Sequence, residues 1–292
     1  MRYRPFARTG MAVSALSLGL NGADDDRKPA AWRELLHAAF EEGVNAFEII
    51  RPSPALLAGV AEGVAAVKRS LLFVSLRINA EIDEIDLAEW VEEVIAAAQV
   101  GELNLLNADA GAANSAGAQA AMRVLKHERR VNRLGVVGDG NLLEAHIEAG
   151  DFDSVVAPFS LLSAWRERHL IRRALERQLG VIACNPFPPE VDQLLEAAQA
   201  KAKPGWFKRA PPLAGAGSYT FLKTTPGWTA EQICLAYALT EPALATVQVE
   251  VDNRRHLAQL ASVADREMPS AVSAQIEMAR FSAGDDSARR SA

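Results

Sequence analysis

The sequence has few cysteines, no long apolar run and no cluster of basic residues. Its two cysteines, Cys184 and Cys234, are too few and too far apart for a disulfide framework or a zinc site. No stretch approaches the ~20 apolar residues that a membrane-spanning helix needs. The net charge of -6, without a basic run, argues against a nucleic-acid partner. These absences predict a globular protein of a reducing compartment, with no membrane or nucleic-acid partner and no metal.

The first twenty residues combine early arginines with apolar side chains, as a secretory signal does. Ser14, Ser17 and Gly19 interrupt the apolar residues, which favours a strand over the continuous core of a signal. We therefore expect a cytoplasmic protein. Hydrophobic residues make up 49% of the 292 positions, which is enough for a substantial core. A small-molecule ligand is the expected partner, and homo-oligomer formation stays open.

Short apolar segments alternate with amphipathic segments along the chain. The apolar segments are almost continuously apolar, which is typical of parallel strands buried on both faces. Eight strand–helix units in about 260 residues predict an α/β fold of the (β/α)8 TIM-barrel type. An open doubly wound sheet is the alternative, but GLNGADDD follows the first strand where a glycine-rich phosphate loop is expected. The predicted strands are VSALSLGL, VNAFEII, LLFVSLRI, ELNLLNA, RLGVVG, SVVAPFSLL, GVIACNPF and ATVQVEV.

Four glycines and the opening segment of the chain add detail to this prediction. Gly43, Gly101, Gly150 and Gly180 follow helical segments and precede strands, so we expect each to be a left-handed helix cap. The opening segment MRYRPFARTGMAVSAL predicts a β-hairpin that caps the barrel.

The rest of the chain predicts a single barrel with one long loop. Residues 186–228 are rich in Pro, Gly and Lys, and we expect them to form a loop over the site. Residues 281–292 are expected to be a disordered tail. No linker divides the chain, so residues 1–280 are expected to form one domain.

Several blocks resemble the aldo/keto reductases, in the same order along the chain. They are YRPFARTGMAVSALSLG, EEGVNAFE, VNRLGVVGDGNLLEAHIEAGDFDSVVAPFSLL, GVIACNPF and TAEQICLAYALTEPALATVQV. The resemblance covers almost the whole chain. It implies the barrel fold, an NADPH cofactor held without a Rossmann domain, and carbonyl reduction by a tetrad of Asp, Tyr, Lys and His.

All four tetrad positions are changed. The family's Asp corresponds to Glu48, its Tyr to Ser53, its Lys to Arg77 and its His to Asn107. A serine hydroxyl cannot replace the phenol as general acid, and losing general acid catalysis costs ~100- to 10,000-fold in rate. Glu48 and Arg77 keep opposite charges, so we expect them to contact each other. They form either a buried ion pair retained for packing or a pair that grips a ligand.

The predicted barrel places a ring of candidate groups at the carboxyl ends of its strands, where barrel enzymes carry their sites. The candidate ligand-binding residues are Arg51, Asp109, Asp139, Ser160 and Asn185.

The family's cofactor positions correspond to residues that suit NADPH poorly. The nicotinamide positions are Val137, Gly138, Val156 and Ser160, and the phosphate positions are Glu250 and Asp252. Two carboxylates repel a phosphate, which Arg254 and Arg255 offset in part. We therefore expect no tightly bound NADPH and no other cofactor.

The histidines and Cys184 suggest no further chemistry. The five histidines, His37, His127, His146, His169 and His256, are expected on the surfaces of outer helices. Cys184 has no adjacent base, so it is expected to be a core thiol.

Three functions compete. The first is a repurposed non-redox enzyme of lyase, isomerase or cyclisation type that acts on a small polar carbonyl-type ligand. It would use Glu48 as base, with Arg77 and Asn107 holding the oxyanion. The second is a divergent NADPH-dependent carbonyl oxidoreductase, and the third is a non-catalytic binding or assembly subunit. The sequence favours the first, because three tetrad positions remain polar, and identifies neither substrate nor reaction.

Overall fold

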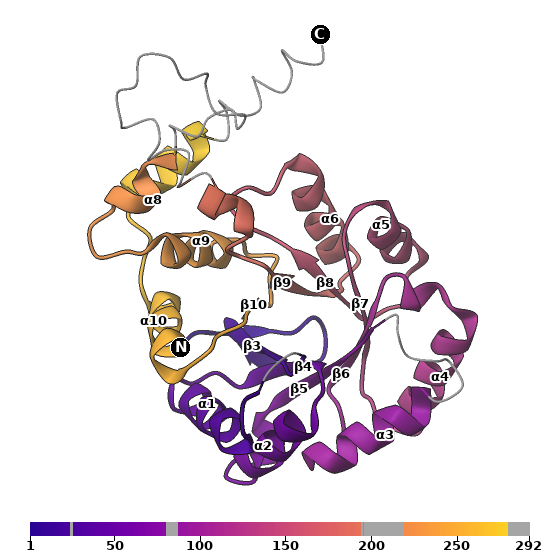
Figure 1. Cartoon of the computed structure of the whole chain (residues 1–292). Helices are drawn as coiled ribbons and strands as arrows, with labels where there is room; N and C mark the ends of the chain where they lie inside the picture. Colours follow the sequence, from indigo (N-terminus) through magenta and orange to yellow (C-terminus); the bar gives the residue numbers. More distant parts are fainter. Residues whose placement is uncertain (24–25, 80–86, 194, 196–218, 280–292) are drawn as a thin grey trace.

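A computed structural model describes residues 1–23, 26–79, 87–193, 195 and 219–279 of the chain. Eight parallel strands form a closed barrel in the order β10-β3-β4-β5-β6-β7-β8-β9 (Figure 1). The predicted TIM barrel is confirmed and the open doubly wound sheet is excluded. The barrel strands are β3 (Leu16–Asn21), β4 (Ala46–Arg51), β5 (Phe73–Ile78), β6 (Leu105–Asp109), β7 (Leu134–Val137), β8 (Ser154–Pro158), β9 (Gly180–Cys184) and β10 (Thr246–Val249).

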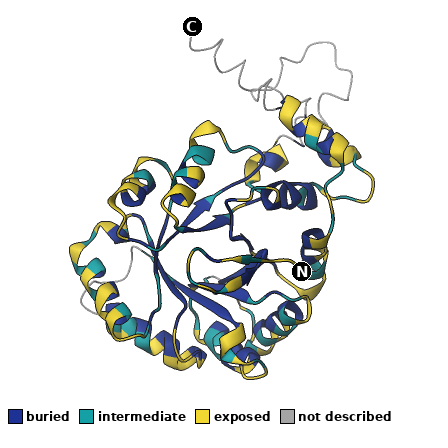
Figure 2. Cartoon of the chain, turned by 180° about the vertical axis from the view of Figure 1, so that it is seen from behind, coloured by how far each residue is buried: buried dark blue, intermediate teal, exposed yellow. Residues whose placement is uncertain are grey.

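Helices surround the strands, with one face toward the barrel and the other exposed (Figure 2). None of the helices in the described part of the chain is long and apolar enough to cross a membrane. The α-helices are α1 (Pro29–Glu41), α2 (Pro54–Val64), α3 (Leu87–Ala98), α4 (Ala116–His127), α5 (Gly140–Ala149), α6 (Trp165–Glu176), α8 (Phe221–Thr224), α9 (Ala230–Leu239) and α10 (Arg254–Ala261), with 3-10 helices η1 (Arg69–Leu71), η2 (Ala112–Asn114) and η4 (Ser262–Asp265).

Alternate residues of each strand face opposite sides, because side chains alternate across a pleated backbone. On β5, Val74 and Leu76 belong to the core between strands and helices, whereas Phe73 belongs to a separate apolar cluster inside the barrel. On β6, Leu106 belongs to the core between strands and helices, and Leu105 belongs to the cluster inside the barrel. This alternation decides which polar side chains can meet in the barrel interior.

The predicted amino-terminal hairpin is present and closes one end of the barrel. Strands β1 (Tyr3–Pro5) and β2 (Ala12–Ser14) pair antiparallel. Phe6, which follows β1, is fully buried in the interior cluster, with its ring centroid 4.6 Å from that of Phe73. Full burial of such a side chain stabilises the fold by ~1.5–3 kcal/mol. The hairpin is therefore an apolar plug at the amino-terminal end of the strands.

Two of the four predicted glycine caps are confirmed. Gly43 and Gly150 have φ values of 80° and 75°, in the left-handed region, directly after α1 and α5. The prediction is wrong for Gly101, because α3 ends at Ala98 and Gln99 is its left-handed cap, with φ 53°. It is also wrong for Gly180, which is the first residue of β9, and Gln178 takes the left-handed conformation instead, with φ 62°. Position 180 needs glycine for another reason, because a Cβ there would lie 2.6 Å from the plugging phenylalanine ring.

Two predictions fall wholly or partly outside the described residues. Most of the loop predicted over 186–228 falls in residues 196–218, and the tail predicted over 281–292 lies entirely beyond the described part. In the described parts of 186–228, residues 189–193 are helical and α8 spans Phe221–Thr224, so the prediction of a continuous loop is wrong there. The rest of the loop, the tail and the single-domain boundary at residue 280 stay predictions.

Candidate active site

Glu48 lies in the middle of β4 and is only 1% exposed. Its Oε2 accepts hydrogen bonds from Arg77 Nη2 at 2.5 Å and from Gln248 Nε2 at 2.7 Å. Its Oε1 accepts a hydrogen bond from Asn107 Nδ2 at 2.7 Å. We call these four residues the Glu48 network. The predicted contact between Glu48 and Arg77 is confirmed.

The Glu48 network spans the barrel interior. Its members come from β4, β5, β6 and β10, and β10 is separated from β4 by β3 in the barrel order. Side chains from strands that do not pair can meet only inside the barrel. Gly135 on β7 leaves room for this arrangement, because a Cβ there would lie 2.0 Å from Asn107 Oδ1. The three polar tetrad positions that the resemblance implied are therefore brought together.

The environment of Glu48 stabilises its carboxylate as an anion. Three donors satisfy its carboxylate, and a buried charge of this kind is tolerated only when it is paired and hydrogen-bonded. A group that is 1% exposed has almost no access to a ligand. Glu48 is thus better placed to hold Arg77 than to remove a proton from a substrate.

Arg77 is the member of the network that reaches accessible space. Its side chain is 14% exposed and lines a cavity at the carboxyl ends of the strands. Burial alone would lower the pKa of Arg77, but the charge and hydrogen bond of Glu48 outweigh it, so the pKa is raised and the guanidinium stays protonated. Nη2 makes the hydrogen bonds to Glu48 and Gln248, and Nε is buried without a partner. Nη1 has no partner among the described residues and is not one of the fully buried atoms, so it remains as an accessible donor.

The cavity has a volume of about 330 Å³. This is at the lower end of the ~300–1,000 Å³ that ligand sites occupy, which suits a small molecule. Two larger cavities, of about 560 and 540 Å³, lie beside the hairpin at the opposite end of the barrel. Enzymes with this architecture work at the carboxyl ends of the strands, so the smaller cavity is the candidate site. Its lining residues are Arg77, Cys184, Asn185, Pro186, Phe187, Glu231, Gln248, Val249 and Glu250.

Asp109 ends β6 two residues beyond Asn107, on the same side of the strand. It is half-buried and makes no side-chain hydrogen bond or ion pair to another described residue. Burial raises the pKa of Asp109 above its ordinary range, Arg77 and Arg51 oppose the rise, and Glu48 adds to it. A carboxyl group with a raised pKa at the mouth of a barrel is suited to proton transfer.

Comparison with solved structures relates this geometry to a known fold. The chain matches an aldo-keto reductase from Bacillus halodurans, in its holo form, with a TM-score of 0.75 over 96% of both chains. The chain has an aldo/keto-reductase fold. The sequence identity is 14%, so the likeness concerns the fold and not the reaction. No protein-family model matches the sequence, and no curated protein matches it.

Several predicted residues of this aldo/keto-reductase fold have local structural roles. Ser53 caps α2, with its Oγ accepting a hydrogen bond from Leu56 N at 3.2 Å, and it does not join the Glu48 network. Ser160 Oγ accepts a hydrogen bond from Leu162 N at 3.1 Å, which closes a local turn. Asp139 is exposed at the start of α5 and makes no capping hydrogen bond. These three predicted positions are not gathered into the candidate site.

Two other predicted ligand-binding residues lie at the mouth. Arg51 is exposed at the end of β4. Asn185 follows β9, lines the cavity and has a φ of 52°, an uncommon conformation for a residue other than glycine.

The positions that the family uses for its cofactor offer few partners to NADPH. Val137 and Val156 belong to the apolar cluster inside the barrel. The backbone N of Gly138 donates to Val156 O at 3.0 Å and is already satisfied. Glu250 lines the cavity, and Asp252 forms an exposed ion pair with Arg27 at 3.0 Å.

The cysteines and histidines provide no nucleophile or metal centre in the described residues. Burial raises the pKa of Cys184 to about 12, which keeps its thiol protonated at neutral pH. No group of three or more His, Cys, Asp or Glu in this part of the chain could hold a metal ion. The prediction of surface histidines is wrong for His146, which is 7% exposed, with Nε2 3.2 Å from Ala110 O.

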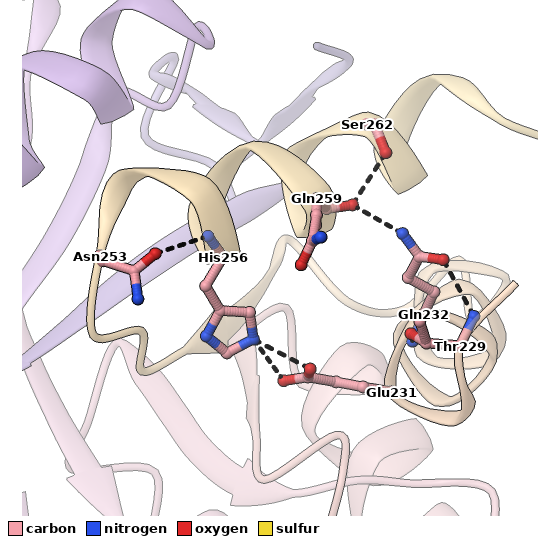
Figure 3. Close-up of polar contacts among 7 residues, drawn as sticks. All are labelled: Thr229, Glu231, Gln232, Asn253, His256, Gln259 and Ser262. Carbon is pink, nitrogen blue, oxygen red and sulfur yellow. Dashed lines mark hydrogen bonds and ion pairs between the residues drawn. The ribbon is translucent and has the colours of Figure 1, made fainter.

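Two further residues of the site were not predicted from the sequence. Gln248 lies on β10 in the interior, where its amide joins the Glu48 network. Glu231 lies in the first turn of α9, and His256 Nε2 is 2.9 and 3.0 Å from its two carboxylate oxygens (Figure 3). The alternation of the segment TVQV could have marked Gln248, but nothing local marks the pairing of two residues on different helices.

Proposed function

We propose that this chain is a divergent member of the aldo/keto reductase superfamily that catalyses a non-redox reaction on a small polar ligand. The reaction class is that of a lyase, an isomerase or a cyclising enzyme, and the ligand carries a carbonyl-type group. Binding takes place in the cavity at the carboxyl ends of the strands. The observation that carries this proposal is the closed Glu48 network, which occupies the tetrad positions with groups bonded to one another.

Neither the Glu48 network nor Ser53 contains a group placed to donate a proton in carbonyl reduction. Glu48 is buried and hydrogen-bonded, Asn107 Nδ2 donates to it, and the hydroxyl of Ser53 caps a helix. Reduction needs a general acid to protonate the developing alkoxide, and its loss costs ~100- to 10,000-fold in rate.

The residues at the cofactor positions do not fit NADPH. Of the nicotinamide positions, Val137 and Val156 are apolar, Gly138 has no side chain and the hydroxyl of Ser160 is bonded to Leu162 N. The phosphate positions carry Glu250 and Asp252, whose negative charges oppose phosphate. Arg254, which could offset them, is 2.6 Å from Glu41 in an ion pair. The proposal therefore has no step that uses this cofactor.

The proposal assigns proton transfer to Asp109 in place of Glu48. Asp109 is not among the residues that line the cavity, but it ends β6 and interacts electrostatically with Arg77, which does line it. Asp109 is half-buried at the mouth, free of hydrogen bonds to described residues, and has a raised pKa. Arg77 is the second group, since its Nη1 is a preorganised donor for an oxygen on which negative charge develops. Asn107 is not assigned the predicted role of stabilising an oxyanion, because its Nδ2 donates a hydrogen bond to Glu48.

A titration of the protein with NADPH, followed by nucleotide fluorescence and calorimetry, tests the proposal. We expect no binding in the micromolar range. Tight binding would return the chain to the second candidate, a divergent NADPH-dependent carbonyl oxidoreductase. The double variant Glu250→Gln, Asp252→Asn serves as a control, and tighter NADPH binding by it would assign the weak affinity to charge repulsion.

A second experiment separates catalysis from binding alone. A bound carbonyl compound is incubated with the protein in deuterium oxide, and exchange at the carbon next to the carbonyl is followed by NMR. Proton transfer by Asp109 predicts exchange that the Asp109→Asn variant loses while it still binds the compound. Binding without exchange in the unaltered protein would support a non-catalytic barrel.

A further inference from the structure

The candidate cavity is lined by both positively and negatively charged side chains, which come from different strands and helices. Arg77 brings a guanidinium from β5, and Glu231 and Glu250 bring carboxylates from α9 and from the end of β10. Arg77 is already neutralised by Glu48, with 2.5 Å between Nη2 and Oε2. The side chain of Glu250 has no hydrogen bond or ion pair within the described part of the chain. The cavity therefore has an excess of negative charge.

The side chain of Glu250 can extend over the mouth of the barrel because the neighbouring residue on β3 is Gly19. A Cβ on Gly19 would lie 3.0 Å from Glu250 Cγ and 3.4 Å from Gln248 Cδ. Without a side chain at Gly19, both side chains can pass over β3 toward the interior. Glu250 is thus directed to the cavity although it is exposed.

Glu231 is held in place by the neighbouring helix. His256, in the first turn of α10, brings Nε2 within 2.9 and 3.0 Å of the two carboxylate oxygens (Figure 3). The first turns of both helices are fixed in turn, since Thr229 and Gln232 form a capping box on α9 and Asn253 caps α10. These contacts therefore hold the Glu231 carboxylate in a defined position at the side of the cavity.

The remaining lining residues carry no charge. Gln248 and Asn185 are polar, and the others are Cys184, Pro186, Phe187 and Val249. Gln248 is nine-tenths buried or more and bonded within the Glu48 network, and Asn185 is exposed at the rim. The accessible donor of the guanidinium, Arg77 Nη1, is the positive group that a ligand can reach. A ligand that is anionic throughout would meet two carboxylates, and a purely cationic ligand would leave Arg77 without an acceptor.

We propose that the cavity binds a small zwitterion, with a carboxylate or similar anionic group on Arg77 and an ammonium group between Glu250 and Glu231. This inference rests on the proposed ligand-binding function and specifies the charge of the ligand. Burying a charged group is costly unless an opposite charge meets it, and the cavity supplies one guanidinium for the anionic end and two carboxylates for the ammonium end. Its volume of about 330 Å³ suits a compact molecule of this kind.

Three four-carbon probes that differ only in their end groups test the proposal. They are 4-aminobutanoate, a zwitterion; succinate, a dianion; and butane-1,4-diamine, a dication. Calorimetry at low ionic strength with the full chain is expected to give ~10-fold or tighter binding of 4-aminobutanoate than of either other probe. Any other order of affinity would overturn the proposal, and so would the absence of 4-aminobutanoate binding.

Two variants locate the ammonium site. Glu250→Gln keeps the shape of the side chain and is expected to weaken 4-aminobutanoate binding by ~10-fold. Asp252→Asn is the matched control, because it removes one negative charge two residues away, at a side chain that is 83% exposed and paired with Arg27 outside the cavity. Equal binding by the Glu250→Gln variant and the unaltered protein would overturn the assignment, and so would an equal loss in the control.

This test is independent of the test of the proposed function. Failure of 4-aminobutanoate to bind, without NADPH binding, removes the zwitterion site and leaves the non-redox proposal standing. Micromolar NADPH binding removes the non-redox proposal whatever the probes do.

Discussion

Substitution of Arg77 by methionine is expected to destabilise the protein strongly. Methionine keeps most of the apolar stem and removes the charge, which leaves the Glu48 carboxylate, 1% exposed, without a cation. Removing one partner of a buried ion pair costs ~3–5 kcal/mol. Asn107 and Gln248 still donate to Glu48, each from 2.7 Å, so we expect a loss near the lower limit, about 3 kcal/mol.

Denaturant titration with linear extrapolation measures this loss, provided that the m-value stays unchanged. In a thermal scan, a loss of 3 kcal/mol corresponds to a fall in Tm of roughly 5 °C, because a chain of this size has an unfolding entropy of about 0.6 kcal/mol/K. The double variant Glu48→Gln, Arg77→Met is the control. It has no uncompensated charge, so it is expected to recover most of the lost stability.

Two results would refute this reasoning. A loss below ~0.5 kcal/mol for Arg77→Met would mean that the ion pair behaves as an exposed one. A double variant as unstable as Arg77→Met alone would mean that the loss comes from packing and not from the stranded charge.

Three further predictions concern single side chains. Because the pKa of Asp109 is raised above the ordinary 3.8 in the folded state, its contribution to stability is complete below that value and is lost as the pH rises through the folded pKa. Asp109→Asn should thus be more stable than the unaltered protein at neutral pH and lose this advantage in acid, and pH-dependent unfolding curves that run in parallel would contradict it. Cys184, with a pKa of about 12, should react with iodoacetamide at pH 7.5 far more slowly than a free thiol, and labelling as fast as that of free cysteine would show that the thiol is not buried. Ser53→Ala should cost ~1 kcal/mol through loss of the helix cap without changing the affinity for 4-aminobutanoate, and weaker binding in calorimetry would place Ser53 in the site after all.

The elements of the barrel could be predicted because their signals are local. The apolar segment around Phe47 and the glycine at position 43 each follow from a few adjacent residues, and the parallel strands form where these patterns occur. Position 180 shows the limit of such reasoning. Its glycine follows a helix as a cap does, yet the residue is needed because Phe6, far away in the sequence, fills the space beside it.

The site could be predicted in part. The resemblance placed Glu48, Arg77 and Asn107 at one end of the barrel, and the structure brings them into one network. It also placed Ser53 there, although Ser53 precedes Pro54 at the start of a helix, and this local signal for a cap could have been recognised from the sequence.

The alternation of strands and helices, the amino-terminal hairpin and the opposite charges at positions 48 and 77 follow from the order of residues along the chain. The hydrogen bond from Gln248 to Glu48 depends on the folded barrel, since 200 residues separate the two. The contact of His256 with Glu231 at the side of the cavity depends on it as well. The physical reason is that side-chain alternation depends on neighbours along the chain, whereas closure of the barrel sets which side chains meet inside it. The burial of Glu48 and the partial exposure of Asp109 and Arg77 follow from that closure.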